Sequence, residues 1–252
     1  MKKRTKIILG TAVVAVAGLA VTAGYITYAK HKEVTLPENF TVTAHTGCEG
    51  TKDNSLEAIE QGYLSGADIV EFDVHFNSDG EPVLAHDYAA DNSVKLKDAF
   101  KLVAKFDNLR VNVDCKTTDN LKAIADIAEE CGVSDRIFYT GIEEKDVAAV
   151  KAQTPEVKYY LNVSIDKTKK YDTEYIRSLA DLVLNNEAAG LNIHYSNASK
   201  KMINIFHQSG LEVSLWTVNK EYDMCRVLNL GCDNITTRQP LMLKDIIDKK
   251  TK

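Results

Sequence analysis

The chain alternates strand-like and helix-like segments along most of its length, and this alternation limits the possible folds more than any other feature. Strand candidates are short apolar or alternating runs at residues 40–47, 69–76, 110–116, 136–142, 158–165, 190–196, 211–219 and 232–237. Helix candidates lie between them at 55–65, 96–106, 120–131, 143–153, 173–185, 198–209 and 221–230, and a last one follows at 241–249. Strands that alternate with helices predict a parallel sheet with helical crossovers.

Eight strand–helix units in a chain of 252 residues predict an α/β fold of the closed (β/α)8 kind, the TIM barrel. An open doubly wound sheet is the alternative, and it normally carries a glycine-rich phosphate loop after its first strand. Gly47 and Gly50 alone do not make such a loop. One excursion breaks the alternation: a turn signal at 77–80 and a short extended run at 81–86 would bring His86 to the barrel mouth.

The N-terminus carries an uncharged run, Ile7–Ala29, that is long enough to span a bilayer as a helix. Basic residues precede it and would stay in the cytoplasm: Lys2, Lys3, Arg4 and Lys6. We therefore expect residues 1–32 to anchor a single barrel domain, 33–252, in the cell membrane and outside the cytoplasm. A cleaved signal peptide, which would release the domain by secretion, is the alternative.

Charge and cysteine content exclude some classes of function. The chain has a formal net charge of −5, and residues 1–32 contain no acid, so the remainder is more acidic still. An acidic domain is a poor ligand for nucleic acid, and we expect none as a partner. The five cysteines show no CxxC spacing, which argues against a zinc cluster. Nothing in the sequence predicts a protein partner.

Two carboxylates share one face of the second predicted strand. Side chains alternate along a strand, so Glu71 and Asp73 point the same way, about 7 Å apart. Such a pair repels and is costly to desolvate unless a positive group lies between its members. A hard divalent cation would supply that charge. A Glu-x-Asp pair alone is more often a solvated strand face, so its significance depends on the residues around it.

Further polar residues end the other predicted strands, which is where the active sites of barrels lie. His45 ends the first strand and His86 ends the excursion, and both could transfer protons near neutral pH. Asp114 and Lys116 end the third strand on one face, and Trp216 lies near the end of the seventh. In a barrel, all of these residues would meet the acidic strand at one mouth.

The ordered set of motifs resembles the glycerophosphodiester phosphodiesterase family. The matching residues are His45 with Gly47, Asp53–Glu57, Glu71 with Asp73, Asp79–Val83, His86 with Asp87, Asp114 with Lys116, Trp216–Asn219, Gly231–Asp233, Thr237 and Pro240. The resemblance implies a (β/α)8 barrel, in agreement with the strand count. It also implies metal-dependent hydrolysis of glycerophosphodiesters, small or lipid-derived, to an alcohol and glycerol 3-phosphate.

The resemblance also implies roles, position by position. One divalent cation, Ca²⁺ or Mg²⁺, would be bound by three carboxylates: Glu71, Asp73 and Asp114. The acid–base pair would be His45 and His86, and the substrate and phosphate contacts would be Lys116 and Trp216. The sequence does not assign which histidine acts as the base.

Three departures from the family pattern leave other functions open. The family usually has arginine after its first histidine, whereas Thr46 cannot grip phosphate with a bidentate fork. The third acid is usually Glu, and the Asp114-x-Lys116-Thr run is similar to spider-venom-type sphingomyelinase/phospholipase D. The connection after Asp87 is short where the family often inserts a subdomain. The alternatives are therefore a phospholipase D-like lyase that forms cyclic phosphate from lysolipids, and a non-catalytic barrel that binds metal or phosphate.

Overall fold

Eight parallel strands close into a barrel in the computed structural model, which describes residues 33–87, 90 and 92–251. The barrel strands are β1 (Thr41–Ala44), β2 (Ile69–Phe76), β4 (Arg110–Cys115), β5 (Ile137–Ile142), β6 (Tyr159–Asn162), β7 (Gly190–His194), β8 (Glu212–Trp216) and β9 (Asn234–Thr237). Strand β1 pairs with both β2 and β9, which leaves the barrel without a free edge. The predicted (β/α)8 barrel is therefore confirmed.

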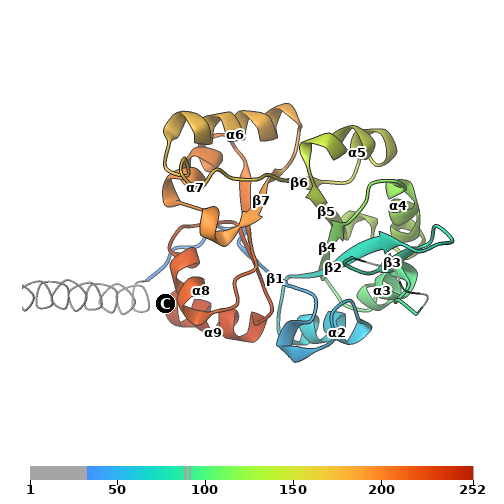
Figure 1. Cartoon of the computed structure of the whole chain (residues 1–252). Coiled ribbons are helices and arrows are strands. Elements are labelled where there is room, and N and C mark those ends of the chain that lie inside the picture. Colours follow the sequence, from blue (N-terminus) through green and yellow to red (C-terminus); the bar gives the residue numbers. More distant parts are fainter. Residues whose placement is uncertain (1–32, 88–89, 91, 252) are drawn as a thin grey trace, which may run out of the picture.

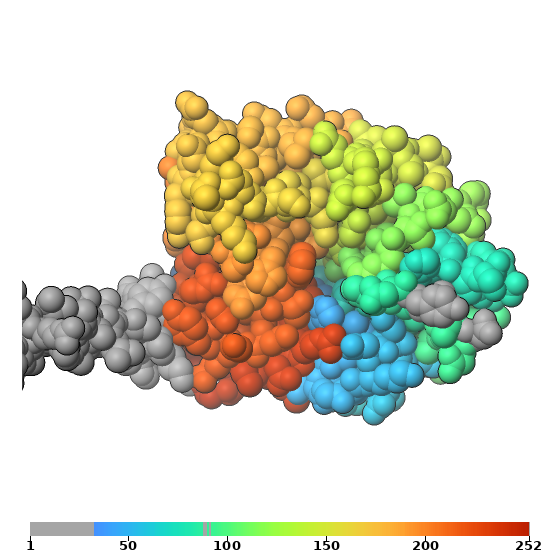
Figure 2. Space-filling model, viewed as in Figure 1, coloured from blue at the N-terminus to red at the C-terminus, as the bar shows by residue number. Residues whose placement is uncertain are grey.

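Helices surround the barrel in chain order, so that the colours in Figure 1 run around the ring from blue to red. They are α2 (Leu56–Leu64), α3 (Leu96–Val103), α4 (Leu121–Glu130), α5 (Val147–Gln153), α6 (Thr173–Asn185), α7 (Lys200–Gln208), α8 (Glu221–Leu228) and α9 (Pro240–Lys250). The first and last segments of the domain, blue and red, lie side by side (Figure 2). Residues far apart in the chain thus meet where the barrel closes.

Local signals fix where the helices begin. The side chains of Ser55, Asp172 and Ser199 each accept a hydrogen bond from a backbone N–H in the first turn of the helix that follows. Such caps satisfy donors that have no partner within the helix. At residues 143–153 the structure differs from the predicted single helix, because a capping box between Glu143 and Asp146 forms a separate 3-10 turn before α5.

The excursion after β2 is a short strand, β3 (Pro82–Leu84), which runs antiparallel to β2. The backbone N–H of Ala85 then donates to the carbonyl of Asp73 at 3.1 Å. This bond ties the residue before His86 to the strand that carries the acidic pair. The turn signal therefore predicted the path of the chain correctly, and His86 reaches the mouth of the barrel.

The two faces of each barrel strand have opposite chemistry. On β2, Val70 and Phe72 face outward into the apolar core between the strands and the helices, whereas Glu71 and Asp73 alternate with them. The interior of the barrel holds many buried polar side chains: Thr43, Glu71, Asp73, Asn112, Thr140, Asn192, Ser214, Asn234 and Thr236. A small apolar cluster of Ile69, Phe138 and Tyr160 lies beside them, near the amino ends of β2, β5 and β6. Folding is thus driven by the outer apolar layer, and the inner layer is left free for polar groups.

Several strands are shorter than the sequence predicts. The predicted strand at 211–219 ends at Trp216, and the one at 158–165 ends at Asn162. Side chains beyond these ends bond to loop backbone instead of continuing the ladder; Asn219 Oδ1, for example, accepts from the backbone N–H of Arg238 at 2.8 Å. The predicted hydrophobic helix at the N-terminus lies outside the described residues and stays a prediction. None of the helices described in the structure is both long and apolar enough to cross a membrane.

Gly190 provides a test of the barrel register. A Cβ atom at this position would lie 2.1 Å from the carbonyl oxygen of Glu212 on the neighbouring strand. We expect Gly190→Ala to lower the free energy of unfolding by about 3 kcal/mol through overpacking, as measured by urea denaturation. Gly210→Ala is the matched control, because its Cβ would meet no atom within 4 Å and only its positive φ would cost about 1 kcal/mol. Equal losses would contradict the register.

Candidate active site

One cavity of about 540 Å³ opens at the carboxyl ends of the barrel strands. Its lining includes all seven residues predicted from the sequence: His45, Glu71, Asp73, His86, Asp114, Lys116 and Trp216. They come from β2, β4 and β8 and from the segments that directly follow β1, β3 and β4, and only closure of the barrel brings all of them together. The cavity therefore lies where barrel enzymes carry their active sites.

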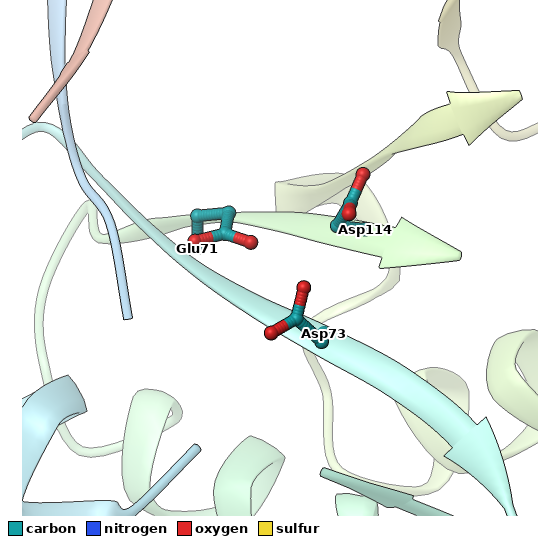
Figure 3. A group of neighbouring side chains, drawn as sticks. All are labelled: Glu71, Asp73 and Asp114. Atoms are coloured by element: carbon teal, nitrogen blue, oxygen red, sulfur yellow. The ribbon is translucent and has the colours of Figure 1, made fainter. Parts of the chain in front are cut away.

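Three carboxylates form the acidic centre of this cavity. Glu71 and Asp73 come from β2, and Asp114 lies directly opposite Asp73 on the neighbouring strand β4. Each offers one oxygen, and these oxygens all lie within 4.8 Å of one another. Figure 3 shows the three side chains turned toward the same space from the two strands. An all-oxygen donor set of this kind suits hard divalent cations such as Ca²⁺ and Mg²⁺.

Lys116 lies among these carboxylates. Its Nζ is 2.8 Å from Asp73 Oδ1 and also donates to Asp114 Oδ2. Burial opposes the charged form of the ammonium group, but the negative charges of Asp114 and Asp73 outweigh it and raise the pKa of Lys116. Thr140 Oγ1 donates to the other oxygen of Asp114 at 2.8 Å. Two of the three carboxylates are therefore charge-paired by the same lysine.

The third carboxylate shows that the cluster is short of positive charge. Burial, and then repulsion by Asp73 and Asp114, raise the pKa of Glu71 well above its ordinary value. Burial would also raise the pKa of Asp73, but Lys116 and a hydrogen bond from Asn54 hold it below its ordinary value. One ammonium thus balances Asp73 and Asp114, whereas the basic group beside Glu71 is the His45 ring, 3.8 Å away, whose pKa is lowered mainly by burial. The donor set and this charge deficit both fit a divalent cation.

Asn54 positions the acidic strand from the loop before α2. Its Nδ2 donates to Asp73 Oδ2 at 2.9 Å, and its Oδ1 accepts from the backbone N–H of Asp73 at 3.1 Å. Asn54 has a φ of 54°, in the left-handed region that asparagine tolerates better than most residues. The sequence analysis included Asn54 only in the family motif Asp53–Glu57 and missed this role. No local sequence signal could have suggested it, because the contact joins a loop to a strand that follows 19 residues later.

The two histidines occupy different environments at the edge of the cluster. The side chain of His45 is 23% exposed, and its Nδ1 is 2.9 Å from the carbonyl of Thr46 and 3.8 Å from Glu71 Oε2. The side chain of His86 is 61% exposed, and its Nδ1 is 2.5 Å from Asp87 Oδ1. Burial is the main cause that lowers the pKa of His45. Because both Nδ1 atoms face acceptors, Nε2 is the nitrogen that each ring has left for proton transfer.

Thr46 and Trp216 complete the wall of the cavity. Thr46 is buried; its backbone N–H donates to Glu71 Oε2 at 2.9 Å, and its hydroxyl accepts from the backbone N–H of Asn54. It therefore orients the site but has no charge to offer a substrate. Trp216 is half-buried, and its ring packs edge-on against His194 with centroids 5.5 Å apart. Its Nε1 is buried without a hydrogen-bond partner among the described residues.

The chain forms a closed parallel barrel, and an acidic cluster and two histidines lie in one cavity at the carboxyl ends of its strands. This arrangement is typical of TIM-barrel enzymes. The chain belongs to the glycerophosphoryl diester phosphodiesterase family, whose family model matches residues 39–111 and 95–242. It is accordingly an enzyme of the phosphoric diester hydrolase class. The family resemblance drawn from the motifs is thereby confirmed.

Individual relatives agree with this assignment. A glycerophosphodiester phosphodiesterase of Caldanaerobacter subterraneus is 24% identical over 244 residues, which cover 82% of this chain and 98% of the relative. The crystal structure of a glycerophosphodiester phosphodiesterase from Parabacteroides distasonis has a TM-score of 0.67 at 19% identity, covering 88% of this chain and 100% of that one. A phosphodiesterase of Oleispira antarctica, solved with its product sn-glycerol-3-phosphate, has a TM-score of 0.66 at 19% identity and covers 84% and 97%. At these identities the solved structures show the shared fold.

Proposed function

We propose that this enzyme hydrolyses glycerophosphodiesters to an alcohol and glycerol 3-phosphate, with one divalent cation and a pair of histidines. The observation that carries the proposal is the convergence of three carboxylates, within 4.8 Å of one another, with two histidines on a single cavity. Carboxylates without histidines would suit a purely structural cation site. Histidines without the carboxylates would have no bound cation beside them to stabilise the negative charge of a phosphodiester.

Glu71, Asp73 and Asp114 are the residues that would hold the cation. When bound, Ca²⁺ or Mg²⁺ would act as a Lewis acid that stabilises negative charge on the phosphoryl oxygens. Asn54 and Thr140 keep two of these carboxylates in place through their hydrogen bonds. Such outer partners fix the orientation of ligands and their affinity for the metal.

His45 and His86 share the proton transfers. One accepts a proton from the attacking hydroxyl, which belongs either to water or to the substrate glycerol, and the other donates a proton to the departing alkoxide. The Nδ1 contacts to Thr46 and Asp87 fix the orientation of each ring and leave Nε2 for this exchange. Lys116 would contact the phosphate once a cation takes over its charge balance with Asp73 and Asp114. Trp216 lies on the cavity wall, where it would contact the substrate.

The metal site is tested by Asp114→Asn. This change keeps the shape of the side chain and removes its charge, so we expect the affinity for Ca²⁺ or Mg²⁺ to fall by at least about tenfold, measured by isothermal titration calorimetry. EDTA should abolish turnover of glycerophosphocholine by the unaltered enzyme, and re-addition of the correct cation should restore it. Asp126→Asn is the control, because Asp126 is exposed on α4 and pairs only with Lys122 among the described residues. Full activity in EDTA would refute metal dependence.

The histidine pair is tested by His45→Gln and His86→Gln. Loss of a positioned proton donor or acceptor should lower kcat for glycerophosphocholine about 10²- to 10⁴-fold, while calorimetry still shows cation binding. His207→Gln is the control, since His207 lies on α7 and pairs with Asp233 at 2.9 Å, away from the cavity lining. If either site variant keeps kcat within twofold of the unaltered enzyme, that histidine is not part of the acid–base pair.

Phosphorus NMR of the products separates hydrolysis from the alternatives. Glycerol 3-phosphate should accumulate as a monoester, with any cyclic phosphate appearing only transiently. A cyclic phosphate that persists would instead identify a phospholipase D-like lyase, and cation or phosphate binding without turnover would identify a non-catalytic barrel. The three outcomes exclude one another, because each leaves a different phosphorus species in solution.

We also propose that the barrel lies outside the cytoplasm, held at the cell membrane by residues 1–32. The support is the uncharged run Ile7–Ala29 behind four basic residues. In intact cells stripped of any wall, added protease should therefore digest the barrel while cytoplasmic proteins survive. Recovery of the digestible protein in the membrane pellet indicates an anchor, and recovery in the medium indicates a cleaved signal. A barrel that resists protease until the cells are lysed would contradict both.

A further inference from the structure

We propose that Arg238, which follows the last barrel strand, is the residue that grips the substrate phosphate. The proposal rests on the proposed function and deepens it, because it names a specificity-determining residue for the same cavity. Arg238 comes directly after β9, and its side chain lines the cavity together with His45 and Thr46. In TIM barrels, phosphate sites are frequently built from the loops that follow the last two strands.

The other two cations of the cavity are lysines, and each has an acidic partner. Lys116 pairs with Asp73 and Asp114, inside the acidic cluster. Lys145 is 74% exposed at the rim, where its Nζ is 2.7 Å from Glu143. Together with Arg238 these are the Lys and Arg residues found among the described residues that line the cavity. Arg238 is therefore the one guanidinium there, and guanidinium is the group that matches a phosphate with a planar fork.

The backbone of Arg238 is held on both sides. Its N–H donates to Asn219 Oδ1 at 2.8 Å, and its carbonyl accepts from the backbone N–H of Glu49 at 2.8 Å. These bonds link the end of β9 to the loop after β8 and to the loop after β1. The base of the side chain is thus fixed relative to the two loops that border the cavity, which reduces the entropy lost when it binds a ligand.

The guanidinium itself is oriented by Asp53. Arg238 Nη1 lies 2.8 Å from Asp53 Oδ1, and this pair packs against Gly47, where a Cβ atom would come within 2.8 Å of Nη1. A guanidinium has five N–H donors, and the Asp53 contact uses one nitrogen, so others remain for an anion. The side chain is 37% exposed and Arg238 lines the cavity, so the guanidinium is accessible to an anion. Thr46, whose hydroxyl is committed to Asn54, cannot fill this role.

The test compares Arg238→Gln, Arg238→Lys and the unaltered full chain in binding sn-glycerol 3-phosphate and inorganic phosphate by calorimetry. Loss of a charge-assisted contact should weaken Kd about ten- to a hundredfold in Arg238→Gln, with a similar rise in KM for glycerophosphocholine. Arg238→Lys should recover only part of the affinity, because lysine keeps the charge but lacks the fork. Arg177→Gln, on the exposed surface of α6, is the matched control.

Asp53→Asn separates a phosphate contact from a structural ion pair. If the pair only stabilises the loop, Arg238→Gln and Asp53→Asn will lower Tm alike and leave phosphate Kd unchanged, which overturns the proposal. Unchanged Kd and KM in Arg238→Gln at unchanged Tm overturn it equally. Turnover by the unaltered enzyme decides the proposed function independently, because anion affinity is measured without catalysis. Anion binding that is weaker in Arg238→Gln than in Asp53→Asn, at constant Tm, supports the assignment.

Discussion

Three carboxylates and one ammonium group share the mouth of the barrel, and the rest of the site is arranged around this charge imbalance. Lys116 pairs with Asp73 and Asp114, while Glu71 is buried and repelled by both. Buried like charges are costly unless a cation or hydrogen bonds offset them. The hydrogen bonds from Asn54 and Thr140 supply part of that compensation. A divalent cation would supply the rest, so the same imbalance that costs stability makes the cavity suited to metal-assisted chemistry.

The fold tolerates this charge imbalance because apolar and polar side chains are buried mainly in different layers of the barrel. The large apolar core lies between the strands and the surrounding helices, whereas most of the barrel interior is a hydrogen-bonded polar network beside a small apolar cluster of Ile69, Phe138 and Tyr160. Within it, Asn234 Nδ2 donates to Thr43 Oγ1 at 2.7 Å, and Ser214 Oγ donates to Asn234 Oδ1 at 3.0 Å. Because its polar groups have hydrogen-bond partners, this network holds the mouth of the barrel rigid. The apolar burial that stabilises the barrel takes place mainly in the outer layer.

Periodicity in the sequence predicted the barrel and the faces of its strands, because alternation in a strand reports directly on which side is buried. It therefore predicted that Glu71, Asp73 and Asp114 would share a mouth with His45, and the turn signal at 77–80 added His86. Contacts between loops were not predictable in this way. Nothing local to Asn54 shows that it holds Asp73, and the ion pair between Asp53 and Arg238 joins residues from opposite ends of the domain. Such contacts depend on barrel closure, which no window of sequence contains.

Barrel closure also explains why half of the site is made of residues distant in the chain. The backbone N–H of His45 donates to the carbonyl of Thr237 at 2.8 Å, and Arg238 meets Asp53 across the same seam between β1 and β9. The acidic cluster lies on β2 and β4, two neighbouring strands that can pair before the barrel closes. The positions of the three carboxylates thus depend on the pairing of β2 with β4. The orientation of His45 and of the Arg238 guanidinium depends on the pairing of β1 with β9, which closes the barrel. The proposed cation site and the proposed anion site, built on these two supports, would become one active site only when the first and last strands pair.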